Sequence, residues 1–315
     1  MPSETSISDT ANIALDSPSL SDLSERDKPW DKHRGNADTV SYYYAGSEFQ
    51  GYSDRIHDCS ELLDFRLTPD QRDGLMKLKL NSARFCRVRH CPVCQWRRSL
   101  MWKAKAYKIL PKITSVYPTY RWLFVTFTVK NCRITDLRST LDWMHQSFKR
   151  MTKLKVFPAA GWIKSIEVTR GRDGSAHPHF HCLFMVPPSY FGVNYIKQGE
   201  WVELWKKCLR IDYNPVLDVQ AIKKGNSPAV LVPELLKYCT KESDLTADRE
   251  WFLELTRQMH KTRAIATGGI LKDYFSELEQ EPEDLIGKDD DKDLVDEGHL
   301  HFGWKRRGKK YKLVE

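Results

Sequence analysis

The segment GWIKSIEVTRGRDGSAHPHFHCLFMV, residues 161–186, constrains the fold most strongly, because it predicts a β-hairpin. Two runs rich in β-branched and aromatic residues flank a Gly-Arg-Asp-Gly turn at residues 171–174, which is a typical hairpin signal. The second run begins with His177, His179 and His181. Because these residues alternate, an extended backbone points all three imidazoles to one face of the sheet. Three histidines crowded at a strand entrance favour a metal site over simple polar decoration.

Glu167 is the candidate third ligand of that site. A register that pairs Thr169 with His177 also pairs Glu167 with His179, and only an odd shift would turn the carboxylate to the other face. Such a set would hold Mg²⁺ or Mn²⁺ and leave room for a phosphate oxygen. The residues alone do not decide whether His177 or His181 is the partner of His179. The alternative is that Glu167 pairs with a basic residue of its own strand, Lys164 or Arg170.

The rest of the chain alternates helical and extended patterns. Apolar periodicity predicts helices at 95–112, 136–154, 201–209, 232–244 and 248–260, and buried strands at 121–130 and 215–222. Helices mixed with strands that include a hairpin favour an α+β fold with an antiparallel or mixed sheet.

A cysteine cluster precedes the first of these helices. Cys86, Cys91 and Cys94 include a Cys-Pro-x-Cys knuckle, which is typical of structural zinc. A closed tetrahedral site needs a fourth ligand, and Cys59 is the nearest upstream thiol. Two histidines compete with it, His57 and His90. The alternative is a set of buried thiols, which fits poorly with so many charged neighbours.

Basic residues concentrate in the same region. Residues 84–108 contain eight Lys or Arg and no acid, interleaved with two of the ten tryptophans, in a chain of net charge +8. That combination predicts a surface that contacts nucleic-acid phosphates. The candidate DNA-binding residues are Arg84, Arg87, Arg89, Arg97, Arg98 and Lys103. The alternative is the exposed face of an ordinary basic helix.

The predicted helix at 232–244 carries a candidate nucleophile. Glu234 and Tyr238 are four residues apart and would share one helix face, with Lys241 on the same stripe. A tyrosine hydroxyl can attack phosphorus once its proton is removed, and a nearby glutamate can activate water. Such pairs also occur on many helices without a function.

Three motifs in order resemble those of the rolling-circle plasmid replication initiators of the HUH endonuclease superfamily. FVTFTVKN resembles the first motif, HPHFHCLF the second and ELLKYCTK the third. The third matches the branch in which a glutamate precedes a single catalytic tyrosine by four residues. CRVRHCPVCQWRRSLMWKAK also resembles the N-terminal cysteine segment of that branch. The resemblance covers about residues 55–275.

The resemblance implies a central antiparallel sheet with flanking helices, preceded by a small zinc-binding segment. It implies that His179 and His181 are metal ligands, with Glu167 as the third. Tyr238 becomes the nucleophile and Glu234 the residue that activates water at termination. Position 242 is also Glu, so the two-tyrosine route of some relatives is not expected.

The function implied is sequence-specific nicking of a plasmid double-stranded origin, cut as a single strand. Tyrosine attack would leave a 5′-phosphotyrosine and a free 3′-hydroxyl, with Mg²⁺ or Mn²⁺ as catalytic ion, Zn²⁺ as structural ion, and a host helicase and polymerase as partners. One alternative is an HUH transposase or relaxase. The other is a non-catalytic zinc-dependent DNA-binding regulator, which would treat the histidines as structural.

Composition predicts the domain organisation. Residues 1–40, rich in Ser, Asp and Thr, are expected to be a disordered arm. Residues 41–112 would form the zinc-binding segment with its basic helix, 113–275 the nicking domain, and 276–315 an acidic linker followed by a basic tail. No apolar run approaches the ~20 residues of a membrane helix, so a cytoplasmic protein is expected.

Overall fold

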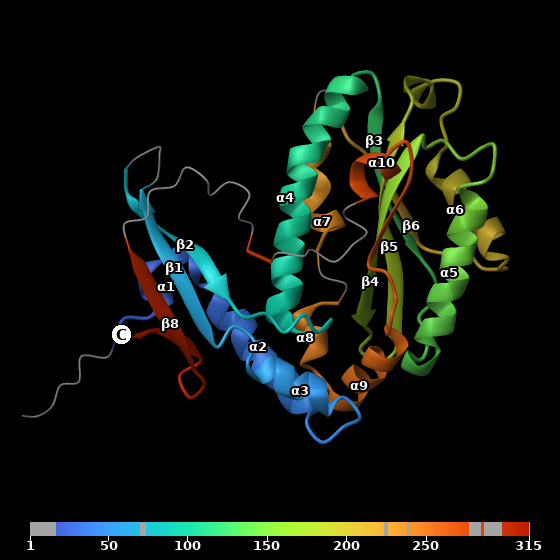
Figure 1. Ribbon diagram of the computed structural model, residues 1–315. Helices are drawn as coiled ribbons and strands as arrows, with labels where there is room; N and C mark the ends of the chain where they lie inside the picture. The colour runs from blue at the N-terminus through green and yellow to red at the C-terminus, as the bar shows by residue number, and fades with distance from the viewer. Residues whose placement is uncertain are drawn as a thin grey trace, which may run out of the picture.

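Two antiparallel sheets organise the computed structural model, which describes residues 17–69, 74–223, 226–237, 240–276, 285–286 and 298–314. One sheet has five strands in the order β6-β3-β5-β4-β7, and the other has four in the order β2-β1-β8-β9. Helix α4 stands between them in Figure 1. The predicted α+β class with an antiparallel sheet is therefore confirmed, and the second sheet is an addition to it.

The predicted hairpin forms the centre of the five-stranded sheet. Its strands are β4 (Gly161–Arg170) and β5 (Ala176–Val186). Thr169 pairs with His177 and Glu167 with His179, which is the register expected from the sequence. The other strands of this sheet are β3 (Arg121–Thr128), β6 (Leu217–Ala221) and β7 (Ile265–Gly269).

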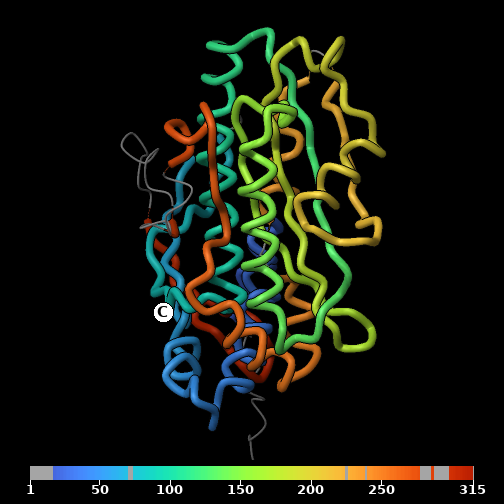
Figure 2. Tube along the Cα trace, turned by 90° about the vertical axis from the view of Figure 1, so that its right-hand side faces the viewer, coloured from blue at the N-terminus to red at the C-terminus, as the bar shows by residue number. Residues whose placement is uncertain are grey.

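Helices cover both faces of the five-stranded sheet. On one face α5 (Leu137–Met151) and α6 (Gln198–Leu209) pack on Phe180 and Phe184 of β5. Figure 2 shows α5 lying in front of the sheet from that side. On the other face α4 (Pro92–Val116) and α7 (Val232–Leu235) pack on Leu183 and Met185. The histidines alternate with Phe180, so they belong to the α4 and α7 face.

The segment predicted as one helix over 232–244 is two short helices, which corrects that prediction. Helix α7 ends at Leu235, and Leu236 leaves the helical region with φ −112° and ψ 31°. The chain becomes helical again in α8 (Glu242–Leu245). Leu235 and Leu236 are buried against α4 and the sheet, whereas Glu242 is held by the N-terminal region. These separate anchors override local helix propensity.

The prediction that residues 1–40 are a disordered arm is wrong for residues 17–40, and residues 1–16 lie outside the described part of the chain. Helix α2 (Pro29–Tyr44) buries Trp30, Ala37, Val40 and Tyr44. These residues recur at helical spacing, but the charged residues between them hide the pattern. The neighbouring helices are α1 (Leu20–Leu23) and α3 (Gln50–His57), with a 3-10 turn at Glu25–Asp27.

The basic tail is also folded, which corrects the prediction of a flexible end. Strands β8 (His299–Lys305) and β9 (Lys310–Val314) form a hairpin that joins β1 (Leu62–Pro69), which in turn pairs with β2 (Met76–Ala83). Phe302, Trp304 and Tyr311 are buried there. Most of the acidic linker, at 277–284 and 287–297, lies outside the described residues.

The remaining elements complete the fold. They are α9 (Arg249–Gln258), α10 (Lys272–Phe275) and three 3-10 turns at Ile134–Asp136, Pro188–Phe191 and Pro228–Leu231. Across the described ranges, every helix is too short or too polar to cross a membrane.

Candidate active site and cysteine cluster

Three buried side chains converge on the α7 face of the central hairpin. Glu167 Oε2 lies 2.9 Å from His179 Nε2 and 2.8 Å from His181 Nε2. Glu167 is 2% exposed, and the two histidines are 8% and 5% exposed. Of the two candidates that the sequence left open as the partner of His179, it is His181 that the structure brings next to Glu167. The ring of His177 lies beside that of His179, with centroids 5.2 Å apart and the ring planes tilted by 39°.

The second nitrogen of each imidazole is also held. His179 Nδ1 lies 3.2 Å from the His177 carbonyl oxygen, which can only accept, so Nδ1 carries a proton and Nε2 is the nitrogen that faces Glu167. His181 Nδ1 lies 3.2 Å from the Thr126 hydroxyl. At 2.9 Å and 2.8 Å, each pair of imidazole Nε2 and Glu167 Oε2 needs a proton or a cation between its two atoms. Two imidazole nitrogens and a carboxylate oxygen within 4.8 Å of one another therefore fit a divalent ion.

The ammonium group of Lys237 is the cation that contacts the carboxylates of this cluster. Its Nζ lies 2.6 Å from Glu167 Oε2 and 2.5 Å from Glu234 Oε1. Glu234 Oε1 is in turn 3.8 Å from His181 Nε2. Burial opposes ionisation of Glu167, but hydrogen bonds from His179, His181 and Lys237 outweigh it and hold its pKa well below the usual range. The carboxylate is therefore ionised at neutral pH.

Sequence reasoning missed Lys237 and selected Lys241 instead. With α7 ending at Leu235, the four-residue spacing no longer defines a common helix face. Lys241 is the exposed N-cap of α8, and among the described residues no hydrogen bond or ion pair joins its ammonium to Glu167. The predicted nucleophile Tyr238 lies outside the described residues; it follows Lys237 directly in the chain.

Four thiols form a second convergent site. The Sγ–Sγ distances are 3.6 Å for Cys59–Cys94, 3.5 Å for Cys86–Cys94 and 3.8 Å for Cys91–Cys59, and all four residues are buried. Hydrogen bonds from the other thiols lower the pKa of Cys94 well below its usual value, so one thiolate forms readily. Four cysteine sulfurs at this spacing fit a closed tetrahedral metal site, in which all four would bind as thiolates, and they are called the tetrathiolate cluster below.

The two histidines that competed for the fourth position take no part. His57 is exposed and lies 3.2 Å from Asp58. His90 is buried with its ring against Phe252, at a centroid distance of 6.1 Å. Cys59 is therefore the fourth member. It follows α3 directly, whereas Cys91 is the N-cap of α4, so the cluster ties the two helices together.

The basic residues do not form one surface, which corrects part of the DNA-contact prediction. Arg97 and Arg98 are 8% and 5% exposed. Arg97 donates to the Leu285 carbonyl, and Arg98 donates to the Arg87 carbonyl at 2.8 Å. Both guanidinium groups thus serve the interior of the protein rather than a phosphate. A contact role remains a prediction for the others, of which Arg84 and Arg87 are exposed, and Arg89 and Lys103 are partly buried.

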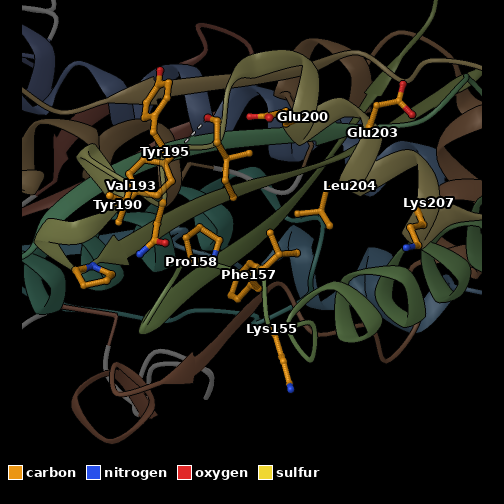
Figure 3. Close-up of a pocket in the computed structure, with 14 residues that line it drawn as sticks. Lys155, Phe157, Pro158, Tyr190, Val193, Tyr195, Glu200, Glu203, Leu204 and Lys207 are labelled. Atoms are coloured by element: carbon orange, nitrogen blue, oxygen red, sulfur yellow. Dashed lines mark hydrogen bonds between the residues drawn. The ribbon is translucent and has the colours of Figure 1, made fainter.

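A hollow of about 740 Å³ lies elsewhere, between the turn after β5 and helix α6 (Figure 3). Its lining includes Phe157, Tyr190, Tyr195 and Leu204. None of the predicted site residues lines it. Because the histidines are on the opposite face of the sheet, this hollow is separate from the candidate active site.

These features define a class of protein: an α+β chain with a buried His-His-Glu cluster, an adjacent lysine and a tetrathiolate cluster. The chain belongs to the replication protein (Rep) family, whose model matches residues 77–312. The sequence resemblance to plasmid replication initiators is thus confirmed at the level of the family.

Individual relatives agree with this assignment. Protein rep of Lentilactobacillus hilgardii is 32% identical over 297 residues, covering 88% of this chain and 92% of its own. Protein rep of Streptococcus pneumoniae is 33% identical over 258 residues, covering 78% of each chain. A replication protein of Staphylococcus aureus is 34% identical over 64% of this chain and 95% of its own. No solved structure matches the chain at a significant level.

Proposed function

We propose that this protein is an HUH-type, single-tyrosine nickase that initiates rolling-circle replication of a plasmid. Its partner would be the plasmid origin in the cytoplasm, opened to single strand at the nick and then extended by a host helicase and polymerase. A central antiparallel sheet with the histidines on its middle strand supports the HUH assignment. Family membership favours replication over transposition or conjugation, and over a purely regulatory role.

The observation that carries the proposal is the convergence of Glu167, His179 and His181 beside Lys237. Lys237 contacts this cluster through its Nζ, and Tyr238 is the next residue in the sequence. A nucleophile and a cation site within reach of one phosphate are what a phosphoryl transfer needs.

Glu167, His179 and His181 would hold the divalent ion, Mg²⁺ or Mn²⁺, which would polarise the scissile phosphate. The Tyr238 hydroxyl attacks phosphorus and gives up its proton. The bond from phosphorus to the 3′-oxygen breaks, and that oxygen takes up a proton. The products are a 5′-phosphotyrosine and a free 3′-hydroxyl.

Lys237 and Glu234 have distinct roles in this scheme. The Lys237 ammonium keeps the Glu167 carboxylate ionised and offers positive charge to the phosphate oxygens. Glu234 is half-exposed, with its side chain 49% accessible, and lies 3.8 Å from His181. This exposure and position support the proposal that Glu234 accepts a proton from water in the closing reaction. The tetrathiolate cluster would hold Zn²⁺ and fix α3 against α4.

Covalent capture tests the proposal. Full-length protein is incubated with Mn²⁺ and single-stranded origin oligonucleotides, and adducts are resolved on a denaturing gel. Wild type should form an adduct that chelation with EDTA abolishes, and Tyr238→Phe should form none. Tyr42→Phe removes an exposed hydroxyl on α2 and should match wild type. An adduct that persists in Tyr238→Phe would refute the assignment of the nucleophile.

A further inference from the structure

A third convergent cluster lies in the four-stranded sheet and belongs to neither site described above. It comprises Asp64 of β1 with His299 and His301 of β8, and is called the Asp64 cluster below. Asp64 Oδ1 lies 2.6 Å from His299 Nδ1 and 3.6 Å from His301 Nε2. One ligand atom from each residue lies within 4.8 Å of the others. Figure 1 shows β1 beside β8, on the far side of α4 from the central hairpin.

Strand register places these residues on one face. Strands β1 and β8 are antiparallel, with Asp64 opposite His301 and Arg66 opposite His299. Leu63 and Phe302 point to the other face and are fully buried. The histidine side chains are 37% and 47% exposed and that of Asp64 is 14% exposed. The cluster therefore opens to solvent, where an ion and its water ligands can reach it.

The second oxygen of Asp64 is already engaged. Oδ2 accepts from Asn81 Nδ2 at 2.5 Å and from the Ser82 hydroxyl at 3.2 Å, both on the flanking strand β2. These bonds orient the carboxylate, so that Oδ1 faces the two imidazoles. Outer hydrogen bonds that orient a ligating carboxylate are typical of metal sites.

We propose that the Asp64 cluster binds a divalent late transition ion of the Zn²⁺ or Ni²⁺ type. The ligand atoms are Asp64 Oδ1, His299 Nδ1 and His301 Nε2, and water fills the remaining positions. Imidazole nitrogens are favourable ligands for such ions, and the cluster of Glu167, His179 and His181 (the Glu167 cluster), which has the same kinds of donor, is expected to bind them as well. The ion ties the C-terminal hairpin to β1, joining segments more than two hundred residues apart in sequence.

The competing explanation is a pair of hydrogen bonds from neutral imidazoles to the carboxylate, with no ion. The two explanations differ in metal stoichiometry and in how substitution of each histidine pair changes it. The Glu167 cluster also contains two imidazoles, so it must be counted separately. No variant changes the tetrathiolate cluster, so the metal bound there is the same in all the proteins compared.

Isothermal titration of untagged full-length protein with Ni²⁺ provides the count. Wild type should show two equivalents beyond the metal it carries after dialysis. His299→Ala/His301→Ala should lose one, and His179→Ala/His181→Ala should lose the other. The matched control His260→Ala removes an exposed histidine outside all the clusters and should keep both. Unchanged stoichiometry and affinity in His299→Ala/His301→Ala would overturn the proposal.

A second measurement uses the wild-type protein, so its result does not depend on whether a variant folds. Substoichiometric Ni²⁺ should broaden the ring C–H NMR signals of His299 and His301 together, with the signal of His260 unaffected. Sharp signals for both rings at two equivalents would overturn the proposal. Thermal unfolding should also shift to higher temperature with Zn²⁺ in wild type, and less so in His299→Ala/His301→Ala.

Discussion

The buried contact between α2 and α8 gives a stability prediction that needs no DNA. Glu242 is 8% exposed; its Oε1 bonds to His33 Nδ1, and its Oε2 accepts from Asn36 Nδ2 at 2.6 Å. The His33 ring also stacks on Trp96, with centroids 4.5 Å apart. Glu242→Ala removes both acceptors, so that buried His33 and partly buried Asn36 each lose a hydrogen bond.

The expected cost follows from these contacts. Each hydrogen bond to a charged group contributes about 1.5–3 kcal/mol, and the Glu242 carboxylate accepts two. Because Asn36 is only partly buried, Glu242→Ala should lower the free energy of unfolding by about 3–5 kcal/mol. Glu242→Gln keeps the shape and one acceptor, so its loss should be roughly half as large.

The pH dependence of this loss has a definite sign. Burial raises the pKa of Glu242, but the bonds from His33 and Asn36 outweigh burial and lower it. The carboxylate thus contributes its full stability above the unfolded-state pKa of about 4.3. That contribution disappears as pH falls through the folded-state pKa. The difference between wild type and Glu242→Gln should be constant near neutrality and shrink in acid.

Urea unfolding followed by tryptophan fluorescence measures these differences. Glu250→Ala is the matched control, because the Glu250 side chain on α9 is 80% exposed and its removal should leave the midpoint unchanged. A loss below about 1 kcal/mol in Glu242→Ala would refute the reasoning, since a buried pair cannot be removed at so small a cost.

Three further predictions concern other sites. Cys59→Ser should lose about one equivalent of bound zinc by elemental analysis whereas His57→Ala keeps it; equal content in both would exclude Cys59 as a ligand. Glu167→Gln should reduce adduct formation by at least about 100-fold, and activity close to wild type would argue against its ligand role. Burial lowers the pKa of Lys164 to about 8, below its unfolded value of about 10.4. The charged lysine therefore destabilises the fold below pH 8. This destabilisation decreases as pH rises from the folded to the unfolded pKa. Lys164→Met should therefore raise the melting temperature at pH 7 and lose this advantage near pH 10; an advantage that persists at pH 10 would contradict burial of the charge as its cause.

Local patterns predicted the central hairpin correctly. Alternation and a short turn fixed the register, and the register placed Glu167 opposite His179. The same alternation left the choice of second histidine open, because His177 and His181 share a face. Only side-chain packing separates them: His181 lies beside Thr126 of β3, whereas His177 continues toward the turn.

Long-range strand pairing could not be predicted from local sequence patterns. The composition of the basic tail predicts a solvated end, yet β8 pairs with β1, and few apolar residues in the tail indicate a strand. Helix α2 was likewise hidden by charged residues, although Arg34 and His33 are buried through specific partners. Lys237 was missed because the sequence argument followed the four-residue spacing of Glu234 and Tyr238, although a helix also brings residues three apart, such as Glu234 and Lys237, close together.

Peptide mapping of the covalent product tests the central claim most directly. Trypsin cleaves after Lys237 and Lys241, so the peptide 238–241 contains a single tyrosine. After reaction with an origin oligonucleotide and nuclease trimming, mass spectrometry should find the remaining 5′-phosphate on that peptide. The phosphate on any other peptide would contradict the claim that nicking takes place beside Glu167, His179 and His181.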